Sequence, residues 1–291
     1  MRRTPVAVGL AVAFAVGVAG SLQAQQNPVA RQQPRGLGVS PTFEGWYQNP
    51  EGTYTLSFGY INRNTVEELT IPVGAKNSVS PGSVDRGQPT YFTPGRSYGV
   101  FAITVPADFG PEDRVTWTLE ANGEKWSIPG GLLNAYETDN LYAHATDEKP
   151  PVLILDEGGV ESRGPNGARV QLPLHRMGRP LRITVAAWEE HHNKEVTLRW
   201  YKYRGPGEIT FNPQEVAVVE SDLQHEVARF GPEGVVVLGT TQATFSEPGD
   251  YVLYVRADHS DVRVAAAGLE QCCWTNGYVS VTVTQGEGQQ P

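Results

Sequence analysis

Histidine, cysteine and acidic side chains that can bind a metal gather in two segments of the second half of the chain. The first segment lies at residues 189–192 and the second at residues 258–274. Imidazole, thiolate and carboxylate groups are ligands of zinc and copper, and loops from several strands can each supply one ligand. The candidate metal ligands are Glu190, His191, His192, Asp258, His259 and Asp261.

A solvated polar loop explains the same residues without a metal. His191 and His192 are adjacent in the sequence, so both rings face one ion only if the chain bends sharply between them. The set also lacks the spacing of a recognised zinc site. We therefore favour a protein without a cofactor, and zinc or copper binding is the alternative.

The only two cysteines, Cys272 and Cys273, are neighbours and cannot cross-link distant parts of the chain. Three states are open: a disulfide formed after export, a pair of metal-bound thiols, or two strand residues of which one is buried. An oxidised pair beside Trp274 would offer a flat surface for a sugar or an aromatic ligand, or would only stiffen the loop. The candidate ligand-binding residues are Trp188, Cys272, Cys273 and Trp274.

Several other aromatic side chains do not all fit the buried faces that the sequence predicts. Some of them would then form a contact surface, whereas Trp117 and Trp200 are in phase with apolar neighbours and are expected in the core. The aromatic residues that do not all fit buried faces are Trp46, Tyr47, Trp126, Trp188 and Trp274.

Signatures of two large enzyme classes are missing from the sequence. It contains no phosphate-binding Gly-Lys-Ser/Thr loop and no dinucleotide-binding fingerprint. His225 and Glu226 are followed by Arg229, where a zincin helix has its second histidine. The paired carboxylates of a glycosidase need only be close in space. No catalytic residue is assigned, and a carbohydrate-active enzyme stays an alternative.

The amino-terminal residues have the pattern of a secretory signal. Arg2 and Arg3 precede an apolar stretch at residues 6–20, and residues 22–24 form a small-residue cleavage site. The apolar stretch is shorter than the roughly 20 residues that a membrane-spanning helix needs. We therefore expect cleavage after Ala24, export to the periplasm or the medium, and no membrane insertion afterwards.

The charge of the chain argues against a nucleic-acid partner. The 291 residues carry a formal charge of −9, and loss of the two arginines in residues 1–24 changes it to −11. No run of lysine and arginine supplies the basic face that a polyanion requires. A protein or a glycan is the expected partner.

Alternation of apolar and polar residues predicts β-strands. Tyr54, Leu56, Phe58 and Tyr60 alternate with smaller residues, and the same period recurs at residues 115–119. Asn122-Gly123, between two such runs, predicts a two-residue hairpin turn. Further alternation predicts four strands, each with one buried face, at residues 181–185, 196–200, 251–255 and 279–283.

The segment ATFSEPGDYVLYVRAD and the later GYVSVTVT resemble the end of a PKD-type or bacterial immunoglobulin-like domain. The resemblance covers about residues 152–285 and implies that Phe245 ends one strand and that Pro248-Gly249 turns the corner. It also implies that Tyr251 is a tyrosine corner and that Trp200 is the buried tryptophan of strand C. Leu253 stands where antibody domains have a cysteine, so the usual disulfide between the sheets is absent.

The first half, with GYINRN, IPVGAKN, DRGQPTYFTPGR and VTWTL, is similar to immunoglobulin-like modules of exported bacterial proteins. We expect an all-β protein: two tandem immunoglobulin-like antiparallel β-sandwich domains after a signal peptide. The loops at residues 189–192 and 258–274 would then emerge at the same end of the second sandwich. The expected segments are a signal peptide (1–24), a flexible segment (25–40), a first sandwich (41–135), a linker (136–151), a second sandwich (152–285) and a tail (286–291).

These observations favour an exported, non-catalytic binding or structural module that contacts a protein or a carbohydrate. A metal-binding protein and a carbohydrate-active enzyme are the alternatives, because the sequence leaves the ligand and the loop chemistry open.

Overall fold

The structure is a computed structural model that describes residues 32–139, 141–142, 149–155, 159–189, 196–218, 235–259 and 273–286. Residues from Gln32 onward belong to one compact unit. Nearly all regular secondary structure in the described part of the chain is β-strand, and one short 3-10 helix, η2 (Asn134–Tyr136), accompanies it. No helix in these ranges is long and apolar enough to cross a membrane. The predicted all-β class is confirmed.

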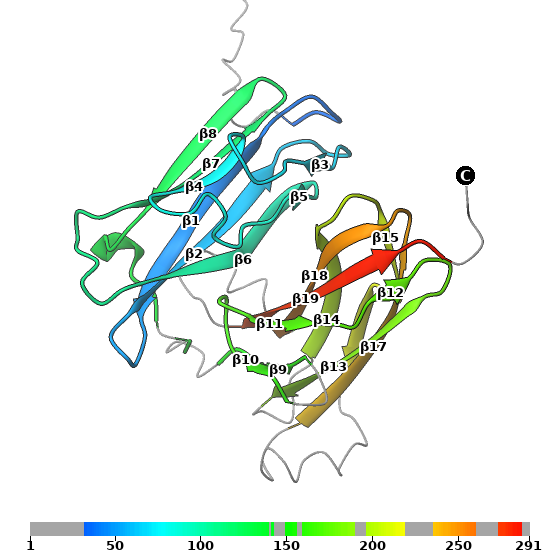
Figure 1. The fold of residues 1–291 in the computed structure, drawn as a ribbon. Helices are drawn as coiled ribbons and strands as arrows, with labels where there is room; N and C mark the ends of the chain where they lie inside the picture. The colour runs from blue at the N-terminus through cyan, green and yellow to red at the C-terminus, as the bar shows by residue number, and fades with distance from the viewer. Residues whose placement is uncertain are drawn as a thin grey trace, which may run out of the picture. The chain divides into compact units, whose positions relative to one another are not determined.

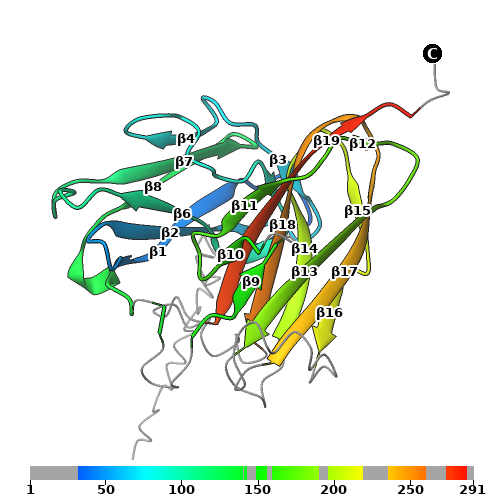
Figure 2. The ribbon, with the colours of Figure 1, turned by 60° about the horizontal axis from the view of Figure 1, so that its bottom comes forward.

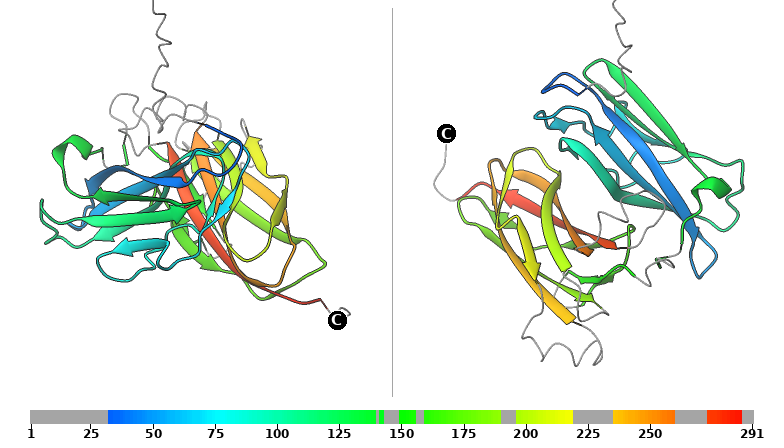
Figure 3. Two further views of the ribbon diagram at one scale, coloured as in Figure 1. Left: turned by 90° about the horizontal axis from the view of Figure 1, so that it is seen from above. Right: turned by 180° about the vertical axis from the view of Figure 1, so that it is seen from behind.

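The N-terminal half of the described chain forms a sandwich of antiparallel sheets with the strand orders β1-β2-β6, β4-β7-β8 and β3-β5. Figure 1 and both views of Figure 3 show β1 and its neighbours running side by side. The strands are β1 (Val39–Gln48), β2 (Tyr54–Asn62), β3 (Leu69–Thr70), β4 (Asn77–Ser80), β5 (Tyr91–Phe92), β6 (Gly95–Val105), β7 (Val115–Ala121) and β8 (Glu124–Gly130).

An aromatic cluster around Trp117 of β7 forms the core of the N-terminal sandwich. The Trp117 ring lies 4.9 Å from Phe101 and 6.4 Å from Phe58, and its Nε1 donates a 3.0 Å hydrogen bond to Asn77 Oδ1. The predicted hairpin joins β7 to β8, with positive φ at Asn122 (51°) and Gly123 (77°). The alternation at residues 115–119 therefore identified a core strand.

Strand β2 departs from the prediction of a single buried face. Thr55 and Ser57 are as fully buried as Leu56 and Phe58. β2 is the middle strand of its sheet, and the Thr55 hydroxyl donates to Asn49 Oδ1 and accepts from Asn166 Nδ2 on its second face. Alternation identified the apolar face, but it could not indicate that the polar face is also covered.

The C-terminal half forms a second sandwich with the strand orders β10-β9-β13-β17-β15 and β11-β19-β18-β14-β16 (Figure 2). Pairing is antiparallel except that β11 and β12 run parallel to β19, which the sequence did not predict. The strands are β9 (Val152–Ile154), β10 (Glu161–Ser162), β11 (Ala168–Gln171), β12 (His175–Arg176), β13 (Leu181–Glu189), β14 (Val196–Arg204), β15 (Ile209–Asn212), β16 (Glu215–Val218), β17 (Val235–Phe245), β18 (Gly249–His259) and β19 (Trp274–Thr284).

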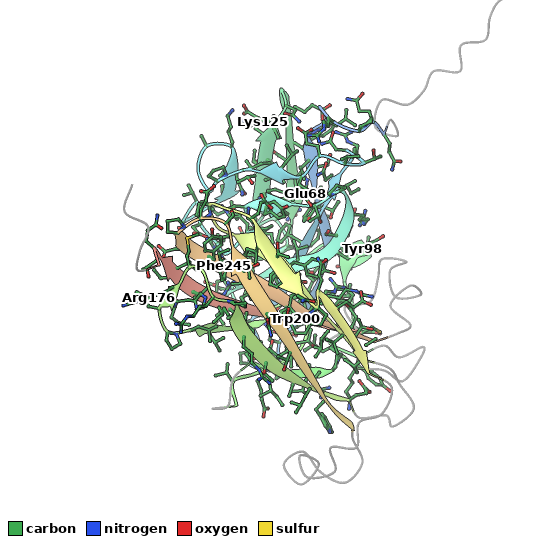
Figure 4. The ribbon with its side chains drawn as sticks, turned by 90° about the vertical axis from the view of Figure 1, so that its right-hand side faces the viewer. Glu68, Tyr98, Lys125, Arg176, Trp200 and Phe245 are labelled. Carbon is green, nitrogen blue, oxygen red and sulfur yellow. The ribbon has the colours of Figure 1, made fainter. Side chains whose placement is uncertain are left out.

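The four strands predicted for this half are β13, β14, β18 and β19, and their apolar positions form its core. Trp200 is among the largest fully buried side chains and lies among these strands (Figure 4). The predicted linker starts on the first sandwich, since Thr138 N donates to Trp46 O and Trp46 Nε1 donates to Leu133 O. The domain boundaries stay a prediction.

The corner between β17 and β18 has the geometry that the resemblance implied. β17 ends at Phe245, β18 starts at Gly249, and the buried Tyr251 donates its hydroxyl to Glu247 O at 2.8 Å. The same hydroxyl accepts a hydrogen bond from the buried Gly207 N at 3.1 Å. This arrangement is the tyrosine corner of immunoglobulin-like sandwiches.

Replacement of Tyr251 by phenylalanine is expected to lower the free energy of unfolding by about 1–3 kcal/mol, because Gly207 N loses its acceptor in a buried position. Urea unfolding would measure the change. Tyr136→Phe, at an exposed position, is the matched control and should stay within about 0.5 kcal/mol of the parent protein. Equal effects of the two substitutions would contradict a stabilising role for the corner.

Candidate functional site

Most of the metal ligands predicted from the sequence cannot be placed. Glu190, His191, His192 and Asp261 lie outside the described residues, and only the main chain of His259 is described. The strand ends that border both loops do lie together, because Val196 pairs with His259 and Asp258 pairs with Trp274. No group of potential metal ligands occurs among the described residues, and the metal site stays a prediction.

Asp258 lies in strand β18 and not in the loop where the sequence placed it. Its carboxylate is buried and accepts a 2.6 Å hydrogen bond from Arg256 Nε and a 3.4 Å one from Arg199 Nη1. Two guanidinium groups therefore already neutralise this carboxylate, which makes it a poor ligand for an additional cation.

Cys273 is disulfide-bonded, buried, and has a φ of 82°. Its sequence neighbour Cys272 lies outside the described residues, so a disulfide between the two stays a prediction. Trp274, the next candidate, is only 3% exposed. Its ring packs against Gly99 and lies 4.6 Å from the Arg256 guanidinium. Contrary to the expectation from the sequence, Trp274 is not an exposed stacking surface.

The aromatic residues expected at a contact surface are mostly buried. Trp46 and Tyr47 belong to the N-terminal sandwich and are covered like Trp274. Trp126 and Trp188 are half-buried, and each has an arginine over its ring, Arg63 at 4.9 Å and Arg163 at 6.0 Å. Neighbouring elements cover these aromatic faces, and the pattern of a single strand does not indicate such coverage.

A cleft of about 230 Å³ opens where the N-terminal strands meet β14 and β18, and tyrosine is its commonest lining residue. We call it the tyrosine cleft. Its lining residues are Tyr60, Pro89, Tyr91, Thr93, Arg96, Ser97, Tyr98, Val100, Arg199, Tyr201, Lys202, Tyr203, Tyr254, Arg256 and Asp258.

Strands β14 and β18 build one wall of the tyrosine cleft from the faces that point away from their core. On β18, Tyr254, Arg256 and Asp258 alternate with the core residues Leu253, Val255 and Ala257. On the paired β14, Arg199 lies opposite Arg256 and Tyr201 lies opposite Tyr254. Because side chains alternate across a strand, the same sequence that fills the core also presents this polar aromatic face.

Strand β6 forms the other wall, and a bulge turns its main chain toward the C-terminal strands. The register with β2 shifts between Phe58 and Tyr60, opposite residues 98–100. Three consecutive carbonyls there accept hydrogen bonds from Arg256 Nη1 (Tyr98 O, 2.6 Å), Asn276 Nδ2 (Gly99 O, 2.6 Å) and the Tyr278 hydroxyl (Val100 O, 2.8 Å). Figure 4 labels Tyr98 on this strand.

Gly99 allows this close approach. Its φ is 52°, in the region that favours glycine, and a Cβ there would collide with the ring of Trp274. A second set of contacts lies beyond the cleft, where the Tyr203 hydroxyl donates to Gly87 O and Thr90 N donates to Tyr203 O. Arg204 also pairs with Asp85 through both terminal nitrogens, at 2.9 and 2.8 Å. Both walls are therefore held in place by hydrogen bonds.

Each positive charge that lines the tyrosine cleft has an acidic partner. Arg199 pairs with Glu215 at 2.7 Å, and Lys202 lies 3.8 Å from Glu208 and 4.3 Å from the Tyr91 ring. Arg256 pairs with Asp258, and Arg96 lies 3.5 Å from Glu44 and 4.3 Å from the Tyr98 ring. The described lining residues carry four positive charges and one negative charge, and the sum is zero when the partners Glu44, Glu208 and Glu215 are counted as well.

Burial keeps the cleft tyrosines protonated. It raises the pKa of Tyr203 and Tyr254 well above the ordinary value, and that of Tyr201 in the same direction. Burial alone would lower the pKa of Arg256, but the negative charge of Asp258 raises it above its usual range. The cleft therefore presents neutral phenol hydroxyls and permanently charged guanidinium groups at physiological pH.

Glu44, on β1, is a buried carboxyl behind the bulge. It accepts hydrogen bonds from Gly99 N at 2.5 Å and from the Thr42 hydroxyl at 3.1 Å. Burial raises the pKa of Glu44 to about 6, although the Gly99 hydrogen bond and the charge of Arg96 act in the opposite direction. The folded protein therefore holds this proton at a pH where the unfolded chain has released it.

Glu44 is expected to make the folded protein less stable as the pH rises through about 6. Below the ordinary glutamate pKa of 4.5, the protonated Glu44 side chain favours the folded state. This contribution, about 2 kcal/mol, is lost once the pH has risen above the pKa of Glu44 in the folded protein, about 6. Thermal unfolding of the parent protein and of Glu44→Gln would be measured between pH 4.5 and 7.5. The free energy of unfolding of the variant, relative to that of the parent, should increase by that amount over this range. Glu112→Gln, at an exposed position, is the control for net charge, and parallel curves for all three proteins would contradict the expectation.

The sequence Gly-x-Ser-x-Gly occurs at residues 95–99, and its three central residues line the cleft. An α/β-hydrolase places this motif on a sharp turn between a strand and a helix. Here Ser97 lies within the antiparallel strand β6, opposite Tyr60. Among the residues that the structure describes, no histidine lines the cleft. The motif therefore lacks the structural context of a nucleophile elbow.

Sequence reasoning missed the tyrosine cleft although part of its signal was visible. Arg199, Tyr201 and Tyr203, like Tyr254, Arg256 and Asp258, are two residues apart along their strands. Aromatic and arginine side chains at every second position, opposite a buried face, differ from the small polar residues usual on a solvated face. That pattern could have identified the face, but not its partner on β6.

Comparisons with known proteins leave the chain without an assigned family. No family model matches the sequence, and no curated protein matches it. Among solved structures, a PapD-like domain of human CEP192 is 6% identical, with a TM-score of 0.27 over 42% of this chain and 84% of that one. CfaE, the adhesive subunit of a fimbria of enterotoxigenic Escherichia coli, is 10% identical, with a TM-score of 0.24 over 84% of this chain and 87% of that one. TM-scores this low carry no argument about function.

Proposed function

We propose that this protein is an exported, non-catalytic binding module and that its ligand occupies the tyrosine cleft. The observation that carries the proposal is the cleft itself, in which the half-buried rings of Tyr91, Tyr98 and Tyr201 lie between two walls fixed by hydrogen bonds. A concave site with a few fixed polar groups is the usual form of a ligand site. Because both walls are already held in place, binding would cost little ordering of side chains.

The state of the ionisable groups supports binding over catalysis. A general acid or base works best with a pKa near the working pH and within reach of the substrate. The only carboxylate that lines the cleft among the described residues, Asp258, is held by two arginines. Glu44, with a pKa of about 6, is buried behind Gly99 and does not line the cleft. Within the described part of the cleft lining, Ser97 has no histidine beside it.

Export rests on the amino-terminal sequence, with its two arginines, its apolar stretch and its small-residue site at residues 22–24. Intact-mass spectrometry of the protein recovered from its producing cells tests this part. Cleavage after Ala24 predicts a chain that begins at Gln25, and a disulfide between the cysteines predicts the gain of two hydrogens on reduction. A chain that retains residues 1–24 in the cytoplasm would contradict export.

Filling the tyrosine cleft is the test of the binding proposal. The full mature chain would be passed over immobilised neutral polysaccharides, acidic polysaccharides and extracellular proteins, and binding would be followed by biolayer interferometry. Ser97→Trp places an indole in the cleft and is expected to weaken the observed binding by at least about tenfold, which corresponds to about 1.4 kcal/mol. Ser97→Ala should keep the binding, since no nucleophile is needed.

Ser127→Trp is the matched control, because Ser127 lies on an exposed face of β8 outside the cleft. Circular dichroism would confirm that all variants are folded. Binding by Ser97→Trp at the level of the parent protein, or no binding to any surface by the parent, would overturn the proposal.

A further inference from the structure

The geometry of the tyrosine cleft points to a neutral carbohydrate as its ligand, with a single sugar ring of a glycan seated between Tyr98 of β6 and Tyr201 of β14. This inference rests on the proposed function, because it assigns a ligand class to the same cleft. Three features carry it: the half-buried aromatic rings, the compensated charges, and a strand edge that is already occupied.

The half-buried tyrosine rings suit the apolar face of a sugar. Tyr91, Tyr98 and Tyr201 come from three different strands and all line the cleft while keeping part of their surface exposed. The C–H groups on one face of a pyranose ring pack against the electron-rich face of an aromatic ring, and a tyrosine adds a hydroxyl at its edge. Among the described lining residues, the aliphatic side chains that would suit a lipid are only Val100 and Pro89.

The charges of the cleft do not favour an anion. The guanidinium groups of Arg96, Arg199 and Arg256 and the ammonium group of Lys202 each have a carboxylate within hydrogen-bonding or ion-pair distance. An anionic ligand would have to compete with Glu44, Glu215, Asp258 or Glu208 for these groups. Sugar hydroxyls both donate and accept hydrogen bonds, so they can add to a guanidinium–carboxylate pair without breaking it.

The strand edge nearest to the cleft is unavailable to a peptide. Extended peptides usually bind by adding a strand to an open sheet edge. The carbonyls of residues 98–100 on β6 already accept hydrogen bonds from Arg256, Asn276 and Tyr278. A peptide strand that paired with these carbonyls would therefore have to compete with the three side-chain donors.

The size of the cleft fits one small unit of a longer ligand. Its volume of about 230 Å³ is below the range of about 300–1,000 Å³ that encloses drug-sized ligands. A single ring would fill it while the remaining residues of a glycan extend into solvent.

The test uses the full mature chain and defined probes. Saturation-transfer NMR and calorimetry would be run with the methyl glycosides of glucose, galactose, mannose and N-acetylglucosamine, with methyl glucuronide as the anionic counterpart, and with a tyrosine-free hexapeptide. We expect at least one neutral glycoside to bind, with an affinity that salt changes little, and no tighter binding of the glucuronide.

Three variants locate the sugar. Tyr201→Leu removes an aromatic ring from the cleft and is expected to weaken the glycoside by about tenfold, and Tyr98→Leu is the second variant in case the first does not fold. Tyr136→Leu, at an exposed tyrosine outside the cleft lining, should bind like the parent protein.

The outcomes separate this inference from the proposed function. Tighter, salt-sensitive binding of the glucuronide, or binding of the hexapeptide alone, would overturn the neutral-sugar assignment; if Ser97→Trp abolished that binding, the cleft would remain the ligand site. Failure of every neutral glycoside to bind would also overturn the assignment. Binding that neither the cleft tyrosines nor Ser97→Trp affect would overturn both proposals.

Discussion

Replacement of Arg256 by alanine is expected to lower the free energy of unfolding by about 3–5 kcal/mol, the range for breaking a buried ion pair from one side. The Arg256 and Asp258 side chains are 12% and 5% exposed, and their Nε–Oδ1 distance is 2.6 Å. Of the contacts with described cations, the substitution leaves Asp258 only the longer one to Arg199, at 3.4 Å. It also removes the donor to Tyr98 O and the cation over the Trp274 ring.

A double variant distinguishes the cost of leaving Asp258 buried without its partner from the net stabilisation that the ion pair provides. Arg256→Met combined with Asp258→Leu removes both charges and keeps most of the volume, so it should recover a large part of the loss. Chemical unfolding of the two single variants and the double variant would provide the coupling energy. Additive losses would contradict the argument, since they would mean that the two side chains act independently.

Replacement of Trp117 by alanine is expected to destabilise the N-terminal sandwich by about 3–5 kcal/mol, as for other buried tryptophans. The ring is fully buried and lies among Phe58, Phe92 and Phe101. Removal of the indole creates a cavity, and the three phenylalanine rings can fill it only by losing their present contacts. Urea unfolding followed by circular dichroism would measure the loss.

Trp117→Phe distinguishes the stability lost by forming a cavity from the stability lost with the hydrogen bond to Asn77. Phenylalanine keeps much of the packed volume but leaves Asn77 Oδ1 without the Trp117 Nε1 donor, so a loss of about 1–3 kcal/mol is expected. Asn77 also donates to Ile71 O and Pro89 O, and this network connects the core to the segment that leads into the cleft. Equal losses for both substitutions would contradict a dominant packing role for the indole.

The local features of the fold could be predicted because they depend on residues close together in the sequence. The Asn122-Gly123 turn needs only two residues that tolerate positive φ. The tyrosine corner joins Tyr251 to Glu247, four positions earlier. The strands at residues 115–119 and 251–255 follow from a period of two, because burial on one face imposes that period.

Features of the fold that depend on which elements meet could not be predicted in this way. The burial of Thr55 and Ser57, the coverage of Trp46 and Trp274, and the parallel pairing of β11 with β19 all require a second element that the local sequence does not specify. A strand pattern records which face is apolar, whereas coverage of the polar face depends on tertiary packing.

The sequence by itself determined the all-β class, the hairpin turn, the corner at Tyr251 that the resemblance implied, and six of the core strands, since each of these is encoded within a few residues. Only the tertiary structure decided where a ligand could bind. The hydrogen bonds that join the walls of the tyrosine cleft connect residues 158 to 178 positions apart. Neither wall forms a cleft alone, and a site whose two halves are that distant exists only after the chain has folded.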